Sequence, residues 1–180
     1  PWRPSHGRVG RFFCNLKYTD GTPFVSEGRQ LLRSASAAAS DAGYQFSMGA
    51  ECEFCLLTTD EFGNPTATPH DNAGYMDIAP EDKGENVRRE ICLTLEEMEI
   101  LPVSSHHAAG PGQHEIDFRY SDPLTSADNI TTYKWAVRTI SEKNGLYAAF
   151  EPGPLRGVSG NTHRIVITLF KNSGSEAEPG

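Results

Sequence analysis

The sequence has no long apolar run and comparatively few basic residues, and both shortages exclude classes of protein. No stretch approaches the roughly 20 consecutive apolar residues of a membrane-spanning helix, and residues 1–13 lack the apolar segment of a secretory signal. Lys and Arg number 16 against 24 Asp and Glu, so the net charge of -8 disfavours a nucleic-acid partner. We therefore expect a cytoplasmic chain with no membrane or nucleic-acid partner. Its first residue is not methionine, which indicates a cut from a longer chain or a trimmed start.

Cysteine is also scarce, with four residues in 180. Cys52 and Cys55 form a single C-x2-C pair, and no second pair lies nearby to complete a zinc site. We interpret the cysteines as reduced thiols packed on a strand and a helix, because free cysteine is among the most buried residue types. A cytosolic chain would keep them reduced.

The length suits one domain with a single core. Residues 27–44, 79–100 and 122–145 have helix-forming composition with apolar residues repeating at helical spacing. Gly43 and Gly145 follow the first and third of these segments as stop signals. The second segment opens with a proline and acidic residues, which favours a helix start at that point.

Alternating and apolar segments predict strands between these helices. Residues 113–120 alternate cleanly between polar and apolar, whereas residues 58–74 form a long polar loop of a kind that is often functional. The other predicted strands lie in residues 11–25 on both sides of a turn at Asp20-Gly21, and in 45–57, 146–155 and 164–170. This mixture predicts an α+β fold, mainly an antiparallel sheet with packed helices, over residues 1–170. A polar tail or linker is predicted at 171–180.

Two glutamates stand out on the strand 45–57. Because side chains alternate along a strand, Glu51 and Glu53 share one face, and Cys52 and Phe54 share the other. Two neighbouring carboxylates repel each other unless a cation lies between them, and Mg²⁺ prefers such oxygen ligands. The alternative is an ordinary polar, solvent-facing strand edge, which is the commoner pattern.

The segment "SSHHAAGPGQHEIDFRY" (104–120) contains a second group of polar residues. Glu115 and Asp117 share a face with Arg119, and a structural pairing of Asp117 with Arg119 or a neighbour is the simpler interpretation. His106 and His107 are adjacent on an extended segment, so at most one of them could reach a site lined by Glu51 and Glu53.

The order of motifs resembles the catalytic domain of type I glutamine synthetases. The resemblance begins at "PWRP" (1–4) and continues through "DGTPF" and "GAECEF". It then follows "GYMDIAPEDKGENVRREICLTLEEM", the segment 104–120, "DPLTSADNITTYKWAVR" and "NGLYAAFEPGPL" in the family's order, to about Phe170. The resemblance implies the family reaction, in which ATP phosphorylates the γ-carboxylate of glutamate and ammonia displaces the phosphate.

The resemblance also implies site residues. Glu51 matches a ligand of one Mg²⁺ or Mn²⁺ ion, and Glu53 and Glu115 match ligands of another. Such ions neutralise a transferring phosphoryl group. Tyr120 matches the position at which the family has an aromatic residue near adenine, and Thr168 matches a second nucleotide-binding position. Gly160 matches a glycine that lines the glutamate pocket.

Three positions depart from the family pattern. Ala108 replaces the carboxylate of an H-H-E motif, and Gly153 replaces the lysine of P-K-P. Arg164 stands where a metal-binding histidine is expected, and His163, one residue away, would point to the opposite face of a strand. A guanidinium at Arg164 would repel a metal cation but could pair with Glu51 and replace the cation's charge.

These departures, with the absence of the family's N-terminal domain and arginine-rich half, predict that the chain alone has no synthetase activity. Three interpretations stay open: a fragment of a synthetase, a non-catalytic binding or regulatory domain of this family, or a fragment of a γ-glutamyl-amine ligase. The resemblance implies glutamate and ammonia as substrates. It also implies self-association, or association with a full-length synthetase subunit.

Overall fold

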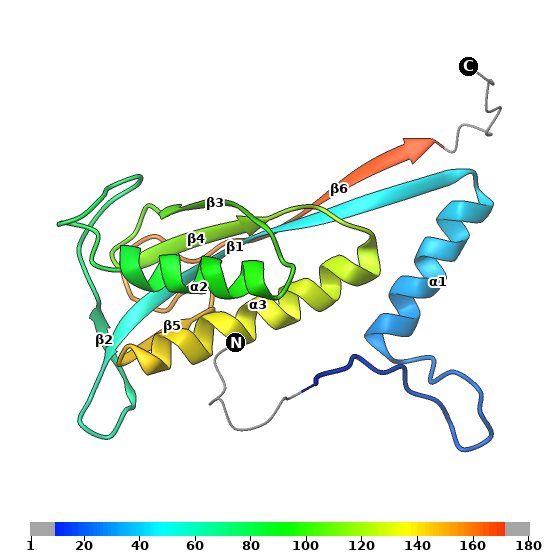
Figure 1. The fold of residues 1–180 in the computed structure, drawn as a ribbon, viewed down its shortest axis with the longest axis horizontal. Coiled ribbons are helices and arrows are strands. Elements are labelled where there is room, and N and C mark those ends of the chain that lie inside the picture. Colours follow the sequence, from blue (N-terminus) through cyan, green and yellow to red (C-terminus); the bar gives the residue numbers. More distant parts are fainter. Residues whose placement is uncertain (1–9, 172–180) are drawn as a thin grey trace.

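The computed structural model describes residues 10–171, so the "PWRP" motif and residues 172–180 lie outside the described residues. Six strands and three helices alternate irregularly along this part of the chain (Figure 1). The helices are α1 (Gly28–Asp41), α2 (Glu85–Glu97) and α3 (Pro123–Lys143). The strands are β1 (Tyr44–Thr59), β2 (Pro65–Pro69), β3 (Pro102–His107), β4 (Gln113–Phe118), β5 (Leu146–Ala149) and β6 (His163–Lys171).

The 16-residue strand β1 is the centre of one six-stranded sheet. Its C-terminal half pairs with β2, β4 and β5, its N-terminal half pairs with β6, and β3 joins the far side of β4. Every pairing is antiparallel. The predicted α+β class with a mainly antiparallel sheet is therefore confirmed.

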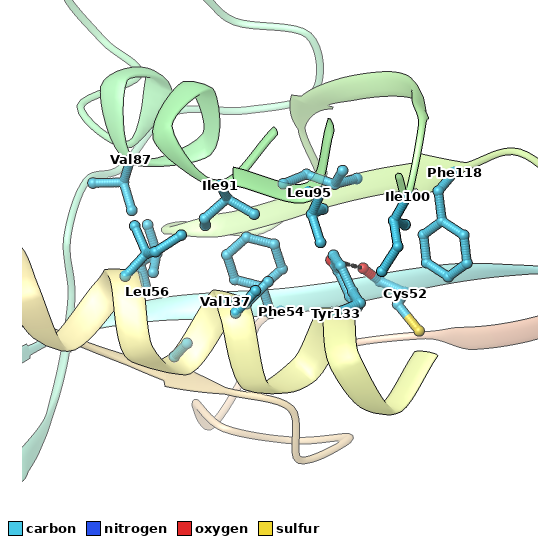
Figure 2. Packing of buried hydrophobic residues seen from close by; sticks show 14 of the residues in the cluster. Cys52, Phe54, Leu56, Val87, Ile91, Leu95, Ile100, Phe118, Tyr133 and Val137 are labelled. Carbon is cyan, nitrogen blue, oxygen red and sulfur yellow. Dashed lines mark hydrogen bonds between the residues drawn. The ribbon is translucent and has the colours of Figure 1, made fainter. Parts of the chain in front are cut away.

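Helices α2 and α3 cover one face of this sheet and form the core with it. Figure 2 shows Ile91 and Leu95 of α2 and Val137 of α3 directed toward Phe54 and Cys52 of β1. The same cluster takes in apolar residues from β4 and β5. Burial of these side chains supplies the main favourable free energy of folding.

Tyr133 of α3 joins the two layers. Its ring is fully buried beside Phe54 and Phe118, and its hydroxyl donates a hydrogen bond to the Cys52 backbone oxygen at 3.0 Å (Figure 2). A buried tyrosine hydroxyl needs such a partner, because an unpaired polar group in the core is costly. The bond fixes the position of α3 along β1.

The ends of α3 agree with the sequence signals. The Asp122 carboxylate accepts hydrogen bonds from the backbone amides of Leu124 and Thr125, both at 3.1 Å, and Pro123 occupies the first turn. After the helix, Gly145 has a φ of 71°, a left-handed conformation that glycine adopts at no steric cost.

Three local predictions were wrong in part. Helix α2 begins at Glu85 rather than near Pro80, because Asp82 turns the chain by accepting a hydrogen bond from the Gly84 amide at 2.9 Å. Residues 11–25 form the predicted turn, but only a single bridge between Lys17 and Pro23. The loop 58–74 contains strand β2.

The cysteines of residues 10–171 are free thiols, as predicted. Cys52 lies in the core under the helices and Cys55 in a smaller cluster with Leu57 and Ala149, so the C-x2-C pair is divided between two clusters. Burial raises the pKa of Cys52 to about 11 and that of Cys55 to about 12. Cys14 differs from the prediction in being exposed.

No helix within residues 10–171 combines the length and apolar character needed to cross a membrane.

Candidate functional site on the open face of the sheet

The sheet face opposite the helices carries the predicted carboxylates. Cys52 and Phe54 are buried in the core, whereas Glu51 and Glu53 are half-buried on the other side of β1. This alternation is the one predicted from the sequence.

Strand register places these carboxylates next to acidic residues of β4. Glu53 lies directly opposite Glu115, and Glu115 lies opposite His106 of β3, with their side chains 3.6 Å apart. Two residues along, Asp117 accepts a hydrogen bond from the Ser104 hydroxyl at 3.0 Å. Several carboxylates therefore meet on one face, where like charges repel unless they are neutralised.

Arg164 of β6 neutralises the first of them. It lies directly opposite Glu51 in the β1–β6 register, and its Nε donates a hydrogen bond to Glu51 Oε2 at 2.6 Å. Its NH2 group donates a second bond to the same oxygen. The pair raises the pKa of Arg164 further above its usual value, so the guanidinium stays charged. His163, the neighbour of Arg164, pairs with Cys52, whose side chain is on the helix-covered face.

Glu53 is held by neutral donors instead. Its Oε2 accepts hydrogen bonds from the Thr162 amide at 2.6 Å, from the Thr162 hydroxyl at 2.7 Å and from Gln113 Nε2 at 3.1 Å. Charge-assisted bonds of this kind are short and comparatively strong. The lone pairs of this oxygen are therefore already engaged within the chain.

Among residues 10–171, no comparable donors hold Glu115. Burial, followed by the negative charges of Asp117 and Glu53, raises the pKa of Glu115 to about 7. Burial also raises the pKa of Asp117 and lowers that of His106. Near neutral pH this part of the face therefore holds a carboxyl group poised between its protonated and ionised forms.

The predicted nucleotide positions lie on the same face. The Tyr120 ring covers Gly49, where a Cβ atom would come within 2.0 Å of the ring carbons. Thr168 pairs with Ser47, four residues before Glu51, so by alternation it shares the face of Glu51.

Of the other predicted positions, Gly153 and Gly160 lie in the segment between β5 and β6, and Ala108 follows β3. The backbone oxygen of Gly160 accepts a hydrogen bond from Gln113 Nε2 at 2.9 Å, and a Cβ at Gly160 would come within 2.1 Å of the Pro152 oxygen. Gly153 is exposed, with open space where a side chain would extend. Ala108 is buried just after β3 and donates its amide hydrogen to the Gln113 oxygen at 2.7 Å.

A second polar cluster, which the sequence did not reveal, is buried between β4 and the chain before α2. Ligand atoms of Asp71, Asp82, His107 and His114 all lie within 4.8 Å of one another. They form the cluster that meets this spacing in residues 10–171, and the three predicted glutamates are not in it. The sequence gave no sign of it because Asp71 and His114 are separated by more than 40 positions in segments without a shared pattern.

Arg88 of α2 acts as the cation of this buried cluster. Its NH1 lies 2.7 Å from Asp82 Oδ2 and donates to His114 Nδ1 at 2.8 Å. His114 thus accepts at Nδ1, and its Nε2 must carry the hydrogen. Burial, then the charge of Arg88, holds the pKa of His114 well below its usual value. The Nε2 atom of His114 is buried and has no hydrogen-bond partner within residues 10–171.

Comparisons with known proteins agree with this architecture. The family described as "Glutamine synthetase, catalytic domain" matches residues 26–177. The chain is 47% identical to a glutamine synthetase of Clostridium saccharobutylicum over 172 residues, and 46% identical to one of Staphylococcus aureus over the same length. These matches cover 96% and 95% of this chain and 39% of each relative.

Solved structures share the fold. A structure of GmaS in complex with ADP has a TM-score of 0.76 at 28% identity, covering 87% of this chain and 36% of that one. A Plasmodium falciparum glutamine synthetase has a TM-score of 0.77 at 24% identity, covering 88% of this chain and 37% of that one. The second likeness, at this identity, concerns the fold alone.

The fold and its open face define an α+β domain with helices on one side of an antiparallel sheet and carboxylates on the other. The chain belongs to the glutamine synthetase family, and what it contains is part of the catalytic domain. It spans about two fifths of the length of the relatives it matches.

Proposed function

We propose that this chain is a glutamine synthetase-like domain that does not synthesise glutamine by itself. The observation that supports the proposal is the pairing of Arg164 with Glu51. Two nitrogens of the Arg164 guanidinium donate to one oxygen, Oε2, of the carboxylate at which the family resemblance places a Mg²⁺ or Mn²⁺ ion. A fixed positive charge at this position repels a divalent cation and satisfies the same carboxylate.

The remaining ligand set also fits a metal poorly. Glu53 uses Oε2 for three internal hydrogen bonds, and Glu115 is partly protonated near neutral pH because its pKa is about 7. The third carboxylate of this position is replaced by Ala108. A divalent ion at Glu53 and Glu115 would have to displace the Thr162 donors and a proton, which lowers its apparent affinity.

Nucleotide binding is proposed separately from catalysis. Tyr120 and Thr168 lie on the open face on either side of Gly49 and Ser47, which suits stacking of a base and a hydroxyl contact. The structural relative GmaS binds ADP. Gly153 provides no lysine for the phosphates, so we expect any ATP or ADP binding to be weaker than in a chain that has one.

The proposal is tested by activity and by metal binding together. In a coupled assay, ATP- and glutamate-dependent phosphate release with ammonia should stay at background, and turnover clearly above background contradicts the proposal. In isothermal titration with Mn²⁺, the unchanged chain should give no heat at micromolar concentrations.

A substitution separates the effect of Arg164 from a general effect of charge. Arg164→His removes the permanent guanidinium and offers a ring nitrogen beside Glu51, so Mn²⁺ affinity should increase by about tenfold or more. Arg156→His is the matched control, because Arg156 is exposed in the loop before β6. Equal Mn²⁺ binding by both variants would show that Arg164 does not take the place of a cation.

A second candidate function is binding or regulation, including association with a full-length synthetase subunit. The intact core beneath an altered open face favours it, since the fold is kept while the metal positions are changed. A fragment of a synthetase or of a γ-glutamyl-amine ligase is the other alternative. Mixing the chain with an active glutamine synthetase separates these: altered activity or co-sedimentation supports the binding role.

A further inference from the structure

Gly49 is an unfavourable residue for its place in the sheet. It lies in the interior of β1, opposite Val166 of β6. Glycine in the middle of a strand is less stable than alanine, because its backbone loses more conformational freedom on folding. A glycine at such a place often marks the close approach of another group to the backbone. The group that approaches Gly49 is the ring of Tyr120.

The ring reaches Gly49 because the strand register changes by one residue after β4. Glu53 pairs with Glu115, and the same register continued along both segments would place Met48 opposite Tyr120. Met48 pairs instead with Ser121: the Met48 amide donates to the Ser121 oxygen at 2.9 Å, and the Ser121 amide donates to the Met48 oxygen at 3.1 Å. Figure 1 shows the chain after β4 running on beside β1 before α3 begins. This segment therefore holds one extra residue relative to β1, which is a β-bulge.

The bulge turns Tyr120 from the helix-covered side of the sheet to the open face. Phe118 is buried in the core, so strict alternation would direct Tyr120 into the core as well. Ser121 occupies the helix side instead, since its hydroxyl lies 2.8 Å from the Ser126 hydroxyl of α3. Tyr120 therefore faces the same side as Gly49. Bulges re-aim side chains in this way beside functional sites.

The backbone around the ring is held in place. The Met48 oxygen also accepts a hydrogen bond from the Ser126 hydroxyl at 2.6 Å, and the Arg119 amide donates to the Leu101 oxygen at 2.9 Å. An ideal Cβ on the glycine would lie 2.0 Å from Cδ1 and Cε1 of Tyr120 and 2.7 Å from Cγ. Three consecutive ring carbons lie this close, so a face of the ring, rather than its rim, rests on the glycine. Any side chain there would displace the ring.

We propose that Gly49 and the bulge after β4 are a positioning device for Tyr120, which holds one face of the ring against the sheet and presents the other to the base of a nucleotide. This inference rests on the nucleotide binding proposed above. The orientation of the ring is set before a ligand arrives, and preorganisation strengthens binding because little freedom is then lost. Gly49 is a positioning residue, since it acts through Tyr120.

Thermal unfolding tests the packing without any ligand. In a Tyr120→Ala background, Gly49→Ala should raise the melting temperature, because alanine is the better strand residue and the ring no longer obstructs it. With Tyr120 present, the same substitution should lower the melting temperature. Gly28→Ala is the matched control: nothing lies near its Cβ position, so its effect should be the same in both backgrounds. Circular dichroism verifies that the variants fold.

ADP affinity, measured by isothermal titration, tests the role of the ring. Gly49→Ala and Tyr120→Ala should each weaken ADP binding by about tenfold, the effect of losing one stacked base. The double variant should bind no more weakly than Tyr120→Ala, since both changes remove the same interaction. Gly49→Ala should still weaken binding in a Tyr120→Phe background, which keeps the ring, whereas Gly28→Ala should leave ADP affinity unchanged.

The outcomes separate this inference from the proposed function. Equal effects of Gly49→Ala on the melting temperature with and without the Tyr120 ring would overturn the packing argument. ADP binding that Gly49→Ala leaves unchanged, or additive losses in the double variant, would overturn the positioning role alone. Failure of the unchanged chain to bind ADP would overturn both this inference and the nucleotide binding on which it rests.

Discussion

Glu53 of β1 and Glu115 of β4 lie directly opposite each other, and their surroundings are unequal. Glu53 accepts three hydrogen bonds through one carboxylate oxygen, whereas Glu115 faces His106 at 3.6 Å. Hydrogen bonds favour the charged form of a carboxyl group, and burial disfavours it. Glu115, which lacks the donors that Glu53 has, is the one of the two whose pKa is raised, to about 7.

This inequality predicts a pH-dependent stability. Glu115 has a pKa of about 7 in the folded chain, raised from an ordinary value of 4.5. A group whose pKa is raised on folding binds its proton more tightly in the folded state, so the free energy of unfolding falls as pH rises from about 4.5 to about 7. Glu115→Gln should reduce that fall by on the order of 1–3 kcal/mol.

Urea unfolding at about pH 5 and about pH 7.5 measures the difference. Glu97→Gln is the control, since Glu97 is exposed at the end of α2, and it should leave the pH dependence unchanged. If Glu115→Gln shifts stability equally at both pH values, Glu115 is not the titrating group.

A glutamate at position 108 should restore part of a metal site. Ala108→Glu places a carboxylate at a buried position, so without metal it should destabilise the fold by about 1–3 kcal/mol. Mn²⁺ should then raise the melting temperature of this variant more than that of the unchanged chain, because binding to the folded state adds stability. Ala109→Glu adds the same charge at an exposed neighbouring position and should show no such gain. Equal shifts in the two variants would mean that position 108 does not face Glu53 and Glu115.

Arg88 should be essential to the buried cluster around Asp82 and His114. Arg88→Met keeps most of the apolar stem but leaves the Asp82 carboxylate buried without its cation, at a cost of about 3–5 kcal/mol. Arg89→Met, at the exposed neighbouring position, should change stability by less than about 0.5 kcal/mol. Chemical denaturation compares the two, and similar losses would show that the buried pair contributes nothing specific.

The hydroxyl of Tyr133 offers a narrower test of the core. Tyr133→Phe keeps the ring contacts with Phe54 and Phe118 and removes only the hydrogen bond to Cys52, so we expect a loss of about 1 kcal/mol. Tyr147→Phe, on the half-exposed strand β5, is the control and should be close to neutral. A Tyr133→Phe variant as stable as the unchanged chain would contradict the proposed anchoring role.

Much of the fold could be predicted where the pattern is local. The alternation through Glu51 and Glu53 indicated both the strand and its two faces, and the signals at Asp122 and Gly145 delimited α3. The start of α2 was predicted too early because a proline followed by acidic residues is also typical of a turn. Here Asp82 accepts a hydrogen bond from the Gly84 amide and forms an ion pair with Arg88.

The site was predictable only in part, for a related reason. The residues of the open face could be named from motif order, and the possibility of an Arg164–Glu51 pair could be stated from charge alone. The hydrogen bonds from Thr162 to Glu53 depend on how β6 meets β1, across 109 residues of sequence. The cluster of Asp71, Asp82, Arg88 and His114 depends on packing between segments that no periodicity relates.

The length of β1 also bears on how this chain is made in the cell. Its first seven residues, Tyr44–Ala50, pair with residues of β6 that all lie more than 110 positions later. Contacts between such distant positions form slowly, because a long loop must close before they are gained. During synthesis, the N-terminal half of β1 therefore has no strand partner until residues 163–171 have left the ribosome. In this interval its apolar side chains and unpaired backbone groups are exposed, and a chaperone would protect them from aggregation.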